Sequence, residues 1–355
     1  MPPSSQKKIL NVNAISLFSG AGGASLGVSR AGFQVVAFSE IKKSAINTHF
    51  KEFPGCRLLT SPDTASADIL KIPDSVFEYY RGSCHLLVGT PPCQGFSNAG
   101  RKRADLGREL IYQFVRATDI IRPTYIICEN VPGLVARKGK DPESGRMEFV
   151  IDIIRNLFKK IGYSITYKVL KATDYGVPQD RKSLIIVGVK DSMQPFRFNK
   201  PLSDSCQAVR PILDTCLKGA IEIHEDNLPQ VGAHMWIETT ERNPTGIPHP
   251  KLVELVVVGN TNSKLLGAQL INPDKPCRLL GASYAKSPKI FVGLYNKDEG
   301  RWWLRCLTVR ELSQIQGFPA DYTWIHGVDS DDAIQQIGNA GIPAIFESIA
   351  RCLLG

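Results

Sequence analysis

Short apolar runs alternate with amphipathic stretches through the first half of the chain. Five such runs read NAISLFSG, FQVVAFSE, HLLVGT, YIICEN and SLIIVGV, and several end in glycine or a polar residue. Between them, ELIYQFVRATDII and EFVIDIIRNLFKKI place apolar residues at helical spacing. Strands that alternate with helices indicate a parallel sheet covered on both faces, so we expect an α/β fold with a doubly wound, Rossmann-like sheet.

The pattern changes between about residues 190 and 301, where proline, asparagine and glycine become frequent and helical periodicity fades. This region predicts a second, smaller and irregular domain made mainly of short strands and loops. Helical patterns return in LTVRELSQIQGF and in DDAIQQIGNAGIPAIFESIARCLL. We find no internal repeat.

Composition supports a folded protein with an anionic partner. The 355 residues are 43% hydrophobic and 22% charged, which allows a sizeable core, and the formal net charge of +9 favours a polyanion. The basic residues occur in short runs, such as residues 101–103 and the pair Arg137 and Lys138. Taken one at a time, each run is expected to be a solvated surface.

Targeting segments and metal sites are not predicted. No apolar run reaches the length of a membrane span, and the first ten residues lack the apolar core of a signal peptide, so we expect a cytoplasmic protein without membrane contact. The nine cysteines form no C-x-x-C pair, and the six histidines lack ligand spacing. We therefore expect neither a disulfide framework nor a bound metal, and most thiols should be small buried residues.

A glycine-rich turn follows the first predicted strand in ISLFSGAGGASLG. Glu40 ends the next predicted strand, 20 residues after Gly20, which is the separation at which an acidic residue meets a ribose in dinucleotide-type folds. No Gly-Lys-Ser/Thr follows, so a phosphate-free nucleoside such as S-adenosylmethionine fits better than ATP. Asp68, in the next interval, is equally compatible with a contact to adenine and with an ordinary turn.

Three further strand ends carry reactive or charged side chains. Cys93 follows one strand and is preceded by Pro91 and Pro92, which restrict the backbone before the thiol. Glu129 closes another strand, and Arg181 stands just before a third. Together they supply a nucleophile, a hydrogen-bonding carboxylate and a fixed cation, although each alone is compatible with a surface role.

The sequence resembles the DNA (cytosine-5)-methyltransferase family. The resemblance spans nearly the whole chain and rests on six blocks in the order usual for that family. They are FSGAGGASLG (18–27), GTPPCQGFS (89–97), ENVPGL (129–134), DYGVPQDR (174–181), LTVRELSQIQGFP (307–319) and QIGNAGIP (336–343).

The resemblance implies a mechanism on a flipped cytosine of duplex DNA. Cys93 would add to C6, which makes C5 nucleophilic, and Glu129 would bind N3 and the exocyclic amine. Arg181 would contact O2 of the base and help to hold Glu129. The loop 94–103 would close over the base, and its basic residues 101–103 would contact phosphates.

It also implies an S-adenosylmethionine pocket and a division into domains. Glu40 would hold the ribose, Ile41 would pack on the adenine, and Asn339 would reach the pocket from the C-terminal region. The full set of cofactor residues is Phe18, Gly20, Gly22, Gly23, Leu26, Glu40, Ile41, Asp68, Ile69 and Asn339. Residues 1–189 and 327–355 would form the catalytic domain, and residues 190–326 the target-recognition domain.

The same resemblance suggests the modification enzyme of a restriction-modification system, a monomer whose cognate restriction endonuclease is a separate chain. The chain departs from the family at Ser183, where a second supporting arginine is common, and at Gly341, where valine is common. The target sequence is not readable. The side chains of suitable type for reading bases are Arg197, Arg210, Lys251, Asn260, Asn262 and Arg278.

Three alternatives remain open from the sequence. The first is an RNA (tRNA) cytosine-5 methyltransferase on the same fold. The second is a catalytically silent DNA-binding protein, against which the intact Cys93, Glu129 and Arg181 argue. The third is a nucleotide-dependent dehydrogenase, which would leave the Pro-Pro-Cys-Gln loop unexplained.

Overall fold

The computed structural model forms two compact units. The first comprises Met1–Leu170, Lys182–Lys200 and Ile345–Gly355, and the second comprises Lys171–Arg181 and Pro201–Ala344. The structure describes residues 12–92, 104–141, 143–199, 207–217, 220–223, 235–236, 253–257, 269–282, 284, 290–296, 299–325 and 331–355.

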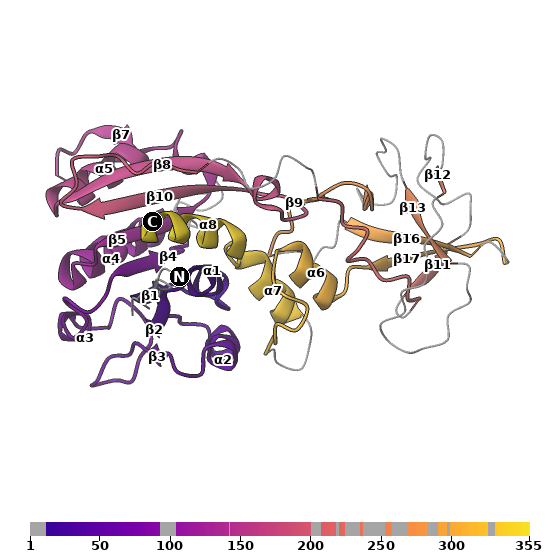
Figure 1. Cartoon of the computed structure of the whole chain (residues 1–355), viewed down its shortest axis with the longest axis horizontal. Helices are drawn as coiled ribbons and strands as arrows, with labels where there is room; N and C mark the ends of the chain where they lie inside the picture. Colours follow the sequence, from indigo (N-terminus) through magenta and orange to yellow (C-terminus); the bar gives the residue numbers. More distant parts are fainter. Residues whose placement is uncertain are drawn as a thin grey trace, which may run out of the picture. The chain divides into compact units, whose positions relative to one another are not determined.

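A seven-stranded sheet organises the first unit (Figure 1). Its strand order is β3-β2-β1-β4-β5-β10-β8. The strands are β1 Asn13–Leu17, β2 Gln34–Phe38, β3 Arg57–Leu58, β4 Leu86–Gly89, β5 Tyr125–Asn130, β8 Tyr163–Lys171 and β10 Lys182–Lys190. The α/β, Rossmann-like class is confirmed, because β1 to β5 pair in parallel.

One part of the sheet differs from the expected parallel arrangement. β10 pairs antiparallel with β5, with Ile185 opposite Glu129. An apolar run of the kind in SLIIVGV marks a buried strand but not its direction, so the sequence pattern could not distinguish the two cases.

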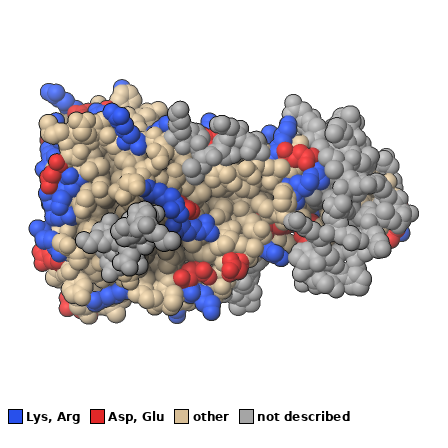
Figure 2. Space-filling model, in the orientation of Figure 1, with Lys and Arg blue, Asp and Glu red and all other residues tan. Residues whose placement is uncertain are grey.

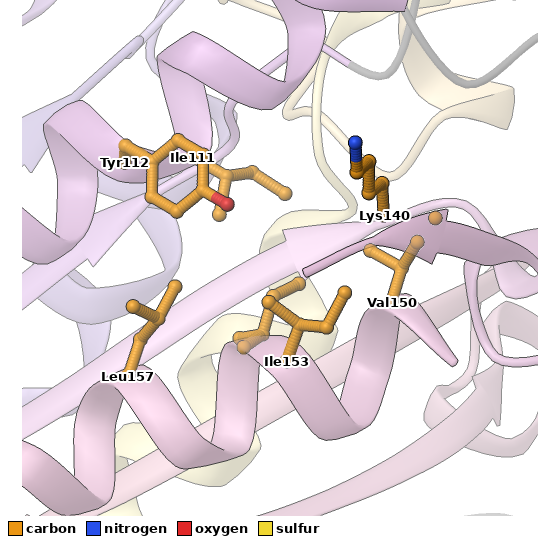
Figure 3. Close-up of a pocket in the computed structure, with 8 residues that line it drawn as sticks. Ile111, Tyr112, Lys140, Val150, Ile153 and Leu157 are labelled. Atoms are coloured by element: carbon orange, nitrogen blue, oxygen red, sulfur yellow. The ribbon is translucent and has the colours of Figure 1, made fainter. Parts of the chain in front are cut away.

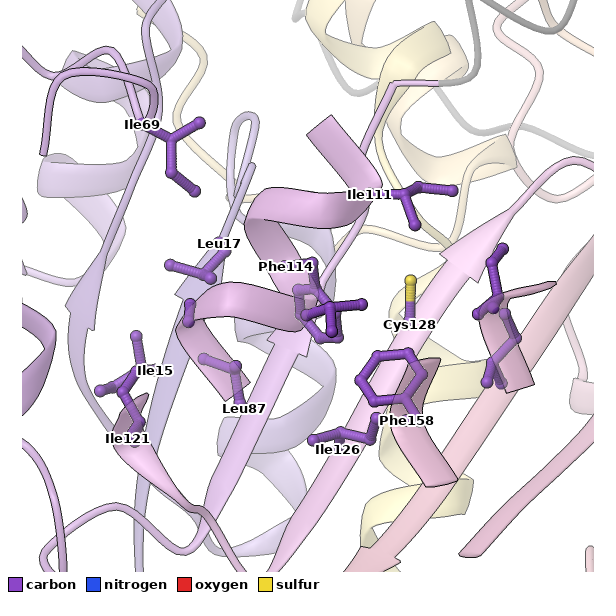
Figure 4. Packing of buried hydrophobic residues seen from close by; sticks show 14 of the residues in the cluster. Ile15, Leu17, Ile69, Leu87, Ile111, Phe114, Ile121, Ile126, Cys128 and Phe158 are labelled. Carbon is purple, nitrogen blue, oxygen red and sulfur yellow. The ribbon is translucent and has the colours of Figure 1, made fainter. Parts of the chain in front are cut away.

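Helices cover both faces of this sheet. They are α1 Gly23–Ala31, α2 Lys43–Glu52, α3 Asp74–Glu78, α4 Ala104–Ile121, α5 Val150–Lys160 and α8 Pro343–Leu354. One core cluster joins α3, α4 and α5 to alternate residues of the strands, including Ile15, Leu87 and Ile126 (Figure 4). α1, α2 and α8 lie together on the other face: Ser25 of α1 bonds His49 of α2, and Arg351 of α8 donates to the Arg30 carbonyl.

The connection from β5 to α5 contains a small hairpin. A 3₁₀ turn, η3 Pro132–Leu134, leads to β6 Lys138–Lys140, which pairs antiparallel with β7 Met147–Phe149. Because this connection leaves the carboxyl end of β5, it lies at the edge of the sheet where open α/β folds bind ligands.

The described part of the second unit is mainly β, as expected. A six-stranded sheet has the order β11-β17-β16-β13-β12, with β14 beside β16, and a short β9 pairs with β15. The strands are β9 Gln179–Asp180, β11 Ile221–Ile223, β12 Met235–Trp236, β13 Val253–Val257, β14 Gln269–Leu270, β15 Cys277–Arg278, β16 Ile290–Asn296 and β17 Arg301–Cys306. This unit also contains η4 Ala172–Tyr175, α6 Val309–Ile315 and α7 Asp331–Asn339.

The C-terminal segment differs from the expectation that no apolar run reaches the length of a membrane span. By length and composition, Asp331–Leu354 is apolar enough to cross a membrane. The segment is nevertheless two helices, α7 and α8, and 61% of its apolar window is buried within the protein. Burial of this extent is ordinary for core helices.

Candidate active site

The glycine-rich turn after β1 has a backbone that few other residues would adopt. Gly20 and Gly22 have φ values of 54° and 99°, and Phe18 has a φ of 53°, which is unusual for an aromatic residue. Ser19 N–H donates to the Ser39 carbonyl at 2.9 Å, and Phe18 N–H donates to Ser39 Oγ at 3.2 Å. The end of β2 therefore fixes the strained start of this turn.

Glu40 binds the turn directly. Its Oε2 accepts the Gly20 N–H at 2.9 Å, while Oε1 accepts the N–H groups of Ile41 and Lys42 at 2.9 and 2.8 Å. A carboxylate has about four acceptor positions, so about one remains on Oε2 for a ligand hydroxyl. The predicted proximity of Glu40 to the glycine turn is thus present, and the carboxylate also holds that turn in shape.

The remaining predicted cofactor residues of the first unit lie around the ends of β1, β2 and β3. Ile41 is 69% exposed, which is unusual for isoleucine and leaves an apolar surface open to a planar ligand. Leu26 is partly buried in the first turns of α1, which begins at Gly23. The side chain of Ile69 is buried in the core, so only its backbone could meet a ligand, and Asp68 Oδ1 accepts the Leu70 N–H at 3.1 Å.

These residues fit a nucleoside-type methyl donor. A Cβ added to Gly20 would meet nothing within 4 Å, so space is open beside the turn. α1 begins after Gly22 without a side-chain cap and without an acidic residue in its first turn. Its first N–H groups suit a ligand carboxylate, as the methionine part of S-adenosylmethionine would supply.

The backbone that leads to Cys93 is held on both sides. Cys93 itself and residues 94–103 lie outside the described residues. Thr90 Oγ1 donates to the Phe18 carbonyl at 2.8 Å, and Asn130 Nδ2 donates to the Pro91 carbonyl at 3.2 Å. β4 lies between β1 and β5, so its exit is tied to the glycine turn on one side and to the end of β5 on the other.

Glu129 stands at the carboxyl end of β5, half-buried. Because Ile185 pairs with Glu129, Ser183 lies on the same face of the sheet, one diagonal step from Glu129. Ser183 is 2% exposed, and its Oγ has no hydrogen-bond partner among the described residues. At the family's second arginine position this chain therefore has a small buried hydroxyl without charge.

Arg181 belongs to the second unit, where its guanidinium is hydrogen-bonded. Its Nη1 donates to the Gly338 carbonyl at 2.9 Å. Two residues earlier, the fully buried Gln179 donates from Nε2 to Gln316 Oε1 at 2.7 Å. Gln316 in turn donates to the Ala340 carbonyl at 2.7 Å. The segment of Arg181 is thus bonded to the end of α7, where Asn339 is exposed.

Four of the described cysteines are excluded as nucleophiles by their surroundings. Cys56, Cys84 and Cys277 are buried, and burial raises the pKa of each to about 12. Burial, followed by the nearby Glu129 charge, raises the pKa of Cys128 still further. A thiolate is the reactive form, so these four are structural, as expected for most thiols of this chain.

Of the six candidate base-reading side chains, Arg197, Arg210 and Arg278 lie within the described residues. Lys251, Asn260 and Asn262 lie outside the described residues. Arg210 makes a bidentate ion pair with Asp274 through Nε and Nη2, at 2.7 and 2.9 Å, which commits it to the unit's own structure. Arg278 is exposed in β15.

The fold and the glycine turn define an α/β protein of the nucleoside-dependent methyltransferase type. A family model for the C-5 cytosine-specific DNA methylase matches residues 12–354. The chain therefore belongs to the C-5 cytosine-specific DNA methylase family and is a DNA cytosine-5 methyltransferase.

Curated relatives and solved structures agree with this assignment. The type II methyltransferase M.MthTI of Methanothermobacter thermautotrophicus is 31% identical over 96% of this chain and 97% of its own length. The type II methyltransferase M1.HphI of Haemophilus parahaemolyticus is 29% identical over 97% and 87% of the two chains. A chain described as a prophage-encoded DNA modification methyltransferase of E. coli superposes with a TM-score of 0.64 at 25% identity, covering 97% of this chain and 99% of that one. The Dnmt2 methyltransferase of S. pombe shares the fold, with a TM-score of 0.66 at 16% identity over 97% of this chain and 98% of that one.

Sequence reasoning missed the residues that hold the site in place. No local sequence pattern specifies the hydrogen-bond partners of Thr90, Ser39, Gln179 and Gln316. Each of these residues bonds to a partner distant in sequence, up to 137 residues away. Thr90, Asn130, Gln179 and Gln316 each lie within one of the six blocks, but the blocks do not specify their hydrogen-bond partners.

Proposed function

We propose that this protein transfers a methyl group from S-adenosylmethionine to C5 of a flipped cytosine in a specific duplex DNA sequence. The observation that carries this proposal is the tethering of the β4 exit to both neighbours, by Thr90 to Phe18 and by Asn130 to Pro91. These two bonds fix the exit of β4 between the glycine turn and the end of β5 that carries Glu129. A nucleophile at Cys93, just after this exit, would act between the cofactor and that carboxylate.

In the proposed reaction, S-adenosylmethionine supplies an electrophilic methyl group when bound. Cys93 adds as thiolate to C6 of the base, forming an S–C6 bond and making C5 nucleophilic. Glu129 binds N3 and the exocyclic amine and stabilises the charge that develops on the ring. C5 takes the methyl group as the S–CH3 bond of the donor breaks and leaves S-adenosylhomocysteine. C5 then loses its proton to a base or to water, and the S–C6 bond breaks to release the Cys93 thiolate.

The other residues take the roles that the family resemblance implies. Glu40 holds the glycine turn and accepts one ribose hydroxyl, Ile41 covers the adenine, and the α1 N-terminus binds the carboxylate of the donor. Arg181 contacts O2 of the base, and Asn339 completes the pocket. We further propose a cytoplasmic, monomeric enzyme with a restriction endonuclease on a separate chain as its partner. The relatives that are named type II methyltransferases support the methyltransferase role.

The reaction is tested by incubating the purified chain with plasmid DNA and S-adenosylmethionine, followed by bisulfite sequencing. We expect 5-methylcytosine at one recurring sequence. A parallel reaction on tRNA tests the alternative substrate. Transfer to tRNA without transfer to duplex DNA would overturn the proposed substrate.

The nucleophile is tested with duplex DNA that carries 5-fluorocytosine at the mapped site. Because fluorine cannot leave C5 as a proton does, we expect a covalent adduct in the presence of S-adenosylmethionine. Cys93→Ser should abolish both adduct and methyl transfer while cofactor binding survives. Cys306→Ser, which alters an exposed thiol in β17, serves as the control and should retain both. An adduct with the Cys93 variant would refute the assignment.

A further inference from the structure

The β6–β7 hairpin presents two lysines and two apolar side chains on one face. Lys138 pairs with Phe149, Gly139 with Glu148, and Lys140 with Met147. Since cross-strand partners share a face and neighbours along a strand alternate, Lys138, Lys140, Met147 and Phe149 lie on one side, here called the outer face. Gly139 and Glu148 lie on the other, where a Cβ on Gly139 would be 3.2 Å from Val150 Cγ2.

The outer face is open to solvent. Met147 is 64% exposed and Phe149 43% exposed, although both are large apolar side chains. Lys138 Nζ lies 5.2 Å from the centre of the Phe149 ring, a cation–π distance that keeps the ammonium beside the aromatic face. Figure 3 shows the Lys140 side chain pointing away from α5, above an apolar hollow lined by residues of α4 and α5.

The acidic side chains of the loop between β6 and β7 are already engaged. Asp141 Oδ1 accepts the N–H groups of Glu143 and Ser144 at 2.9 and 2.6 Å, and the Ser144 bond is the main cause that lowers the pKa of Asp141. Glu143 forms an ion pair with Lys160. Among the described residues, neither Lys138 nor Lys140 forms an ion pair, so the positive charge of the outer face is left for a partner.

The position of the hairpin is the second observation. It lies in the connection that leaves the carboxyl end of β5, and Lys138 is eight residues after Asn130, the last residue of the strand that carries Glu129. Open α/β sheets bind their ligands at this edge. Lys and Arg side chains, with some acidic ones among them, lie along the part of the surface where Figure 1 draws β7 and α5 (Figure 2).

We propose that the outer face of the β6–β7 hairpin binds the phosphate backbone of duplex DNA beside the methylated cytosine. Lys138 and Lys140 each contact a phosphate, and Phe149 holds the Lys138 ammonium in place. The chemistry of the face favours this partner, because two ammonium groups that form no ion pair among the described residues match a polyanion. The proposal rests on the proposed function only in naming DNA as the polyanion.

The test is the salt dependence of binding by Lys138→Gln/Lys140→Gln in the full chain. The probe is a fluorescein-labelled duplex cut from plasmid DNA around a cytosine that the wild type methylates, or a duplex of mixed sequence if none is methylated. Each lost phosphate contact lowers the slope of log K against log salt by about 0.9 on B-DNA, so we expect a decrease of about 1.8. Phe149→Ala should weaken binding at low salt with less change in slope.

The matched control is Lys51→Gln/Lys159→Gln. These exposed lysines lie in the last turns of α2 and α5, at the opposite edge of the same sheet, so the net charge change is equal. Their slope should equal that of the wild type. Equal slopes for both double variants would overturn the proposal, as would a change seen with tRNA but not with duplex DNA.

Binding and turnover separate the two proposals. A reduced slope in a protein that never methylates DNA would refute the proposed function and still support the hairpin contact. Normal methylation with an unchanged slope would support the function and refute the hairpin contact. Thermal unfolding of each variant verifies that the fold is retained.

Discussion

The two compact units hold their polar groups in different ways. In the first unit, site groups such as Glu40, Thr90 and Asn130 bond to backbone, and the buried side-chain pair of Ser25 and His49 is uncharged. In the second unit, charged and amide side chains are themselves buried and pair with one another: Arg305 with Glu311, and Gln179 with Gln316. Buried polar pairs are stable only when complete, so the second unit should be far more sensitive to the loss of a single polar group.

The largest effect should come from Arg305→Met. Arg305 and Glu311 are 3% and 2% exposed and lie 2.7 Å apart, and Glu311 also caps α6 through Thr308. Removing the guanidinium leaves a buried carboxylate without its cation, which costs about 3–5 kcal/mol. Urea unfolding should show this as a markedly lower midpoint.

Two controls sharpen this result. Arg305→Met/Glu311→Leu removes both charges and should recover much of the lost stability, because no charge remains buried alone. Arg155→Met breaks the solvent-exposed Arg155–Asp152 pair of the first unit and should change stability by about 0.5 kcal/mol or less. Similar losses for Arg305→Met and Arg155→Met would show that the two units do not differ in this respect.

The same contrast decides how much the sequence could predict. β1, β2, β4 and β5 were predicted because each is a local apolar run that ends in glycine or a polar residue, and α4 and α5 were predicted by their own periodicity. The antiparallel direction of β10 and the break at Ala340 between α7 and α8 were not. Strand direction depends on the route of the chain. Gly341 and Pro343 are local signals for the break, but apolar residues continue on both sides of it.

The site shows the same division. The link between Glu40 and Gly20 was predictable because a fixed spacing encodes it. The pairing of β11 with β17 and the bond from Gln179 to Gln316 join residues far apart in sequence, and no local pattern specifies them. The basic pair Arg137 and Lys138 was expected to be an ordinary solvated surface, since the sequence does not reveal the hairpin register that places Lys138 beside Phe149.

Gln316→Met should give the next largest effect. Methionine keeps the volume but loses the bond to the Ala340 carbonyl and leaves Gln179 Nε2 unpaired, which costs about 1–3 kcal/mol. Arg181 directly follows β9, so the loss of the Gln179 bond should also displace Arg181. We therefore expect kcat for methyl transfer to fall about 10-fold or more, as happens when a contact that positions a group near the chemistry is lost.

Asn296→Leu is the matched control for that variant. Asn296 is 1% exposed at the end of β16 in the same unit, and its Oδ1 accepts the Glu299 N–H at 3.3 Å. It should lose similar stability and keep its kcat. If both variants keep wild-type kcat, the Gln179–Gln316 pair is structural and does not position Arg181.

The smallest effect concerns His49, the buried titratable group of the first unit. It is fully buried, stacks on Phe38 at 3.8 Å and bonds Ser25 through Nε2, while its Nδ1 has no partner among the described residues. Burial lowers the pKa of His49 from 6.5 to about 3. Between these values the unfolded chain binds a proton that the folded chain does not, so stability is complete above pH 6.5 and falls as the pH falls. From pH 6.5 to about pH 5 the loss should be about 1.5 kcal/mol.

His49→Gln, which retains a hydrogen-bonding side chain but cannot titrate, should lack this pH-dependent loss of stability in urea unfolding at the two pH values. An equal pH dependence in the two proteins would mean that His49 stays solvated or gains a partner, and that its burial does not make the stability of the first unit sensitive to charge.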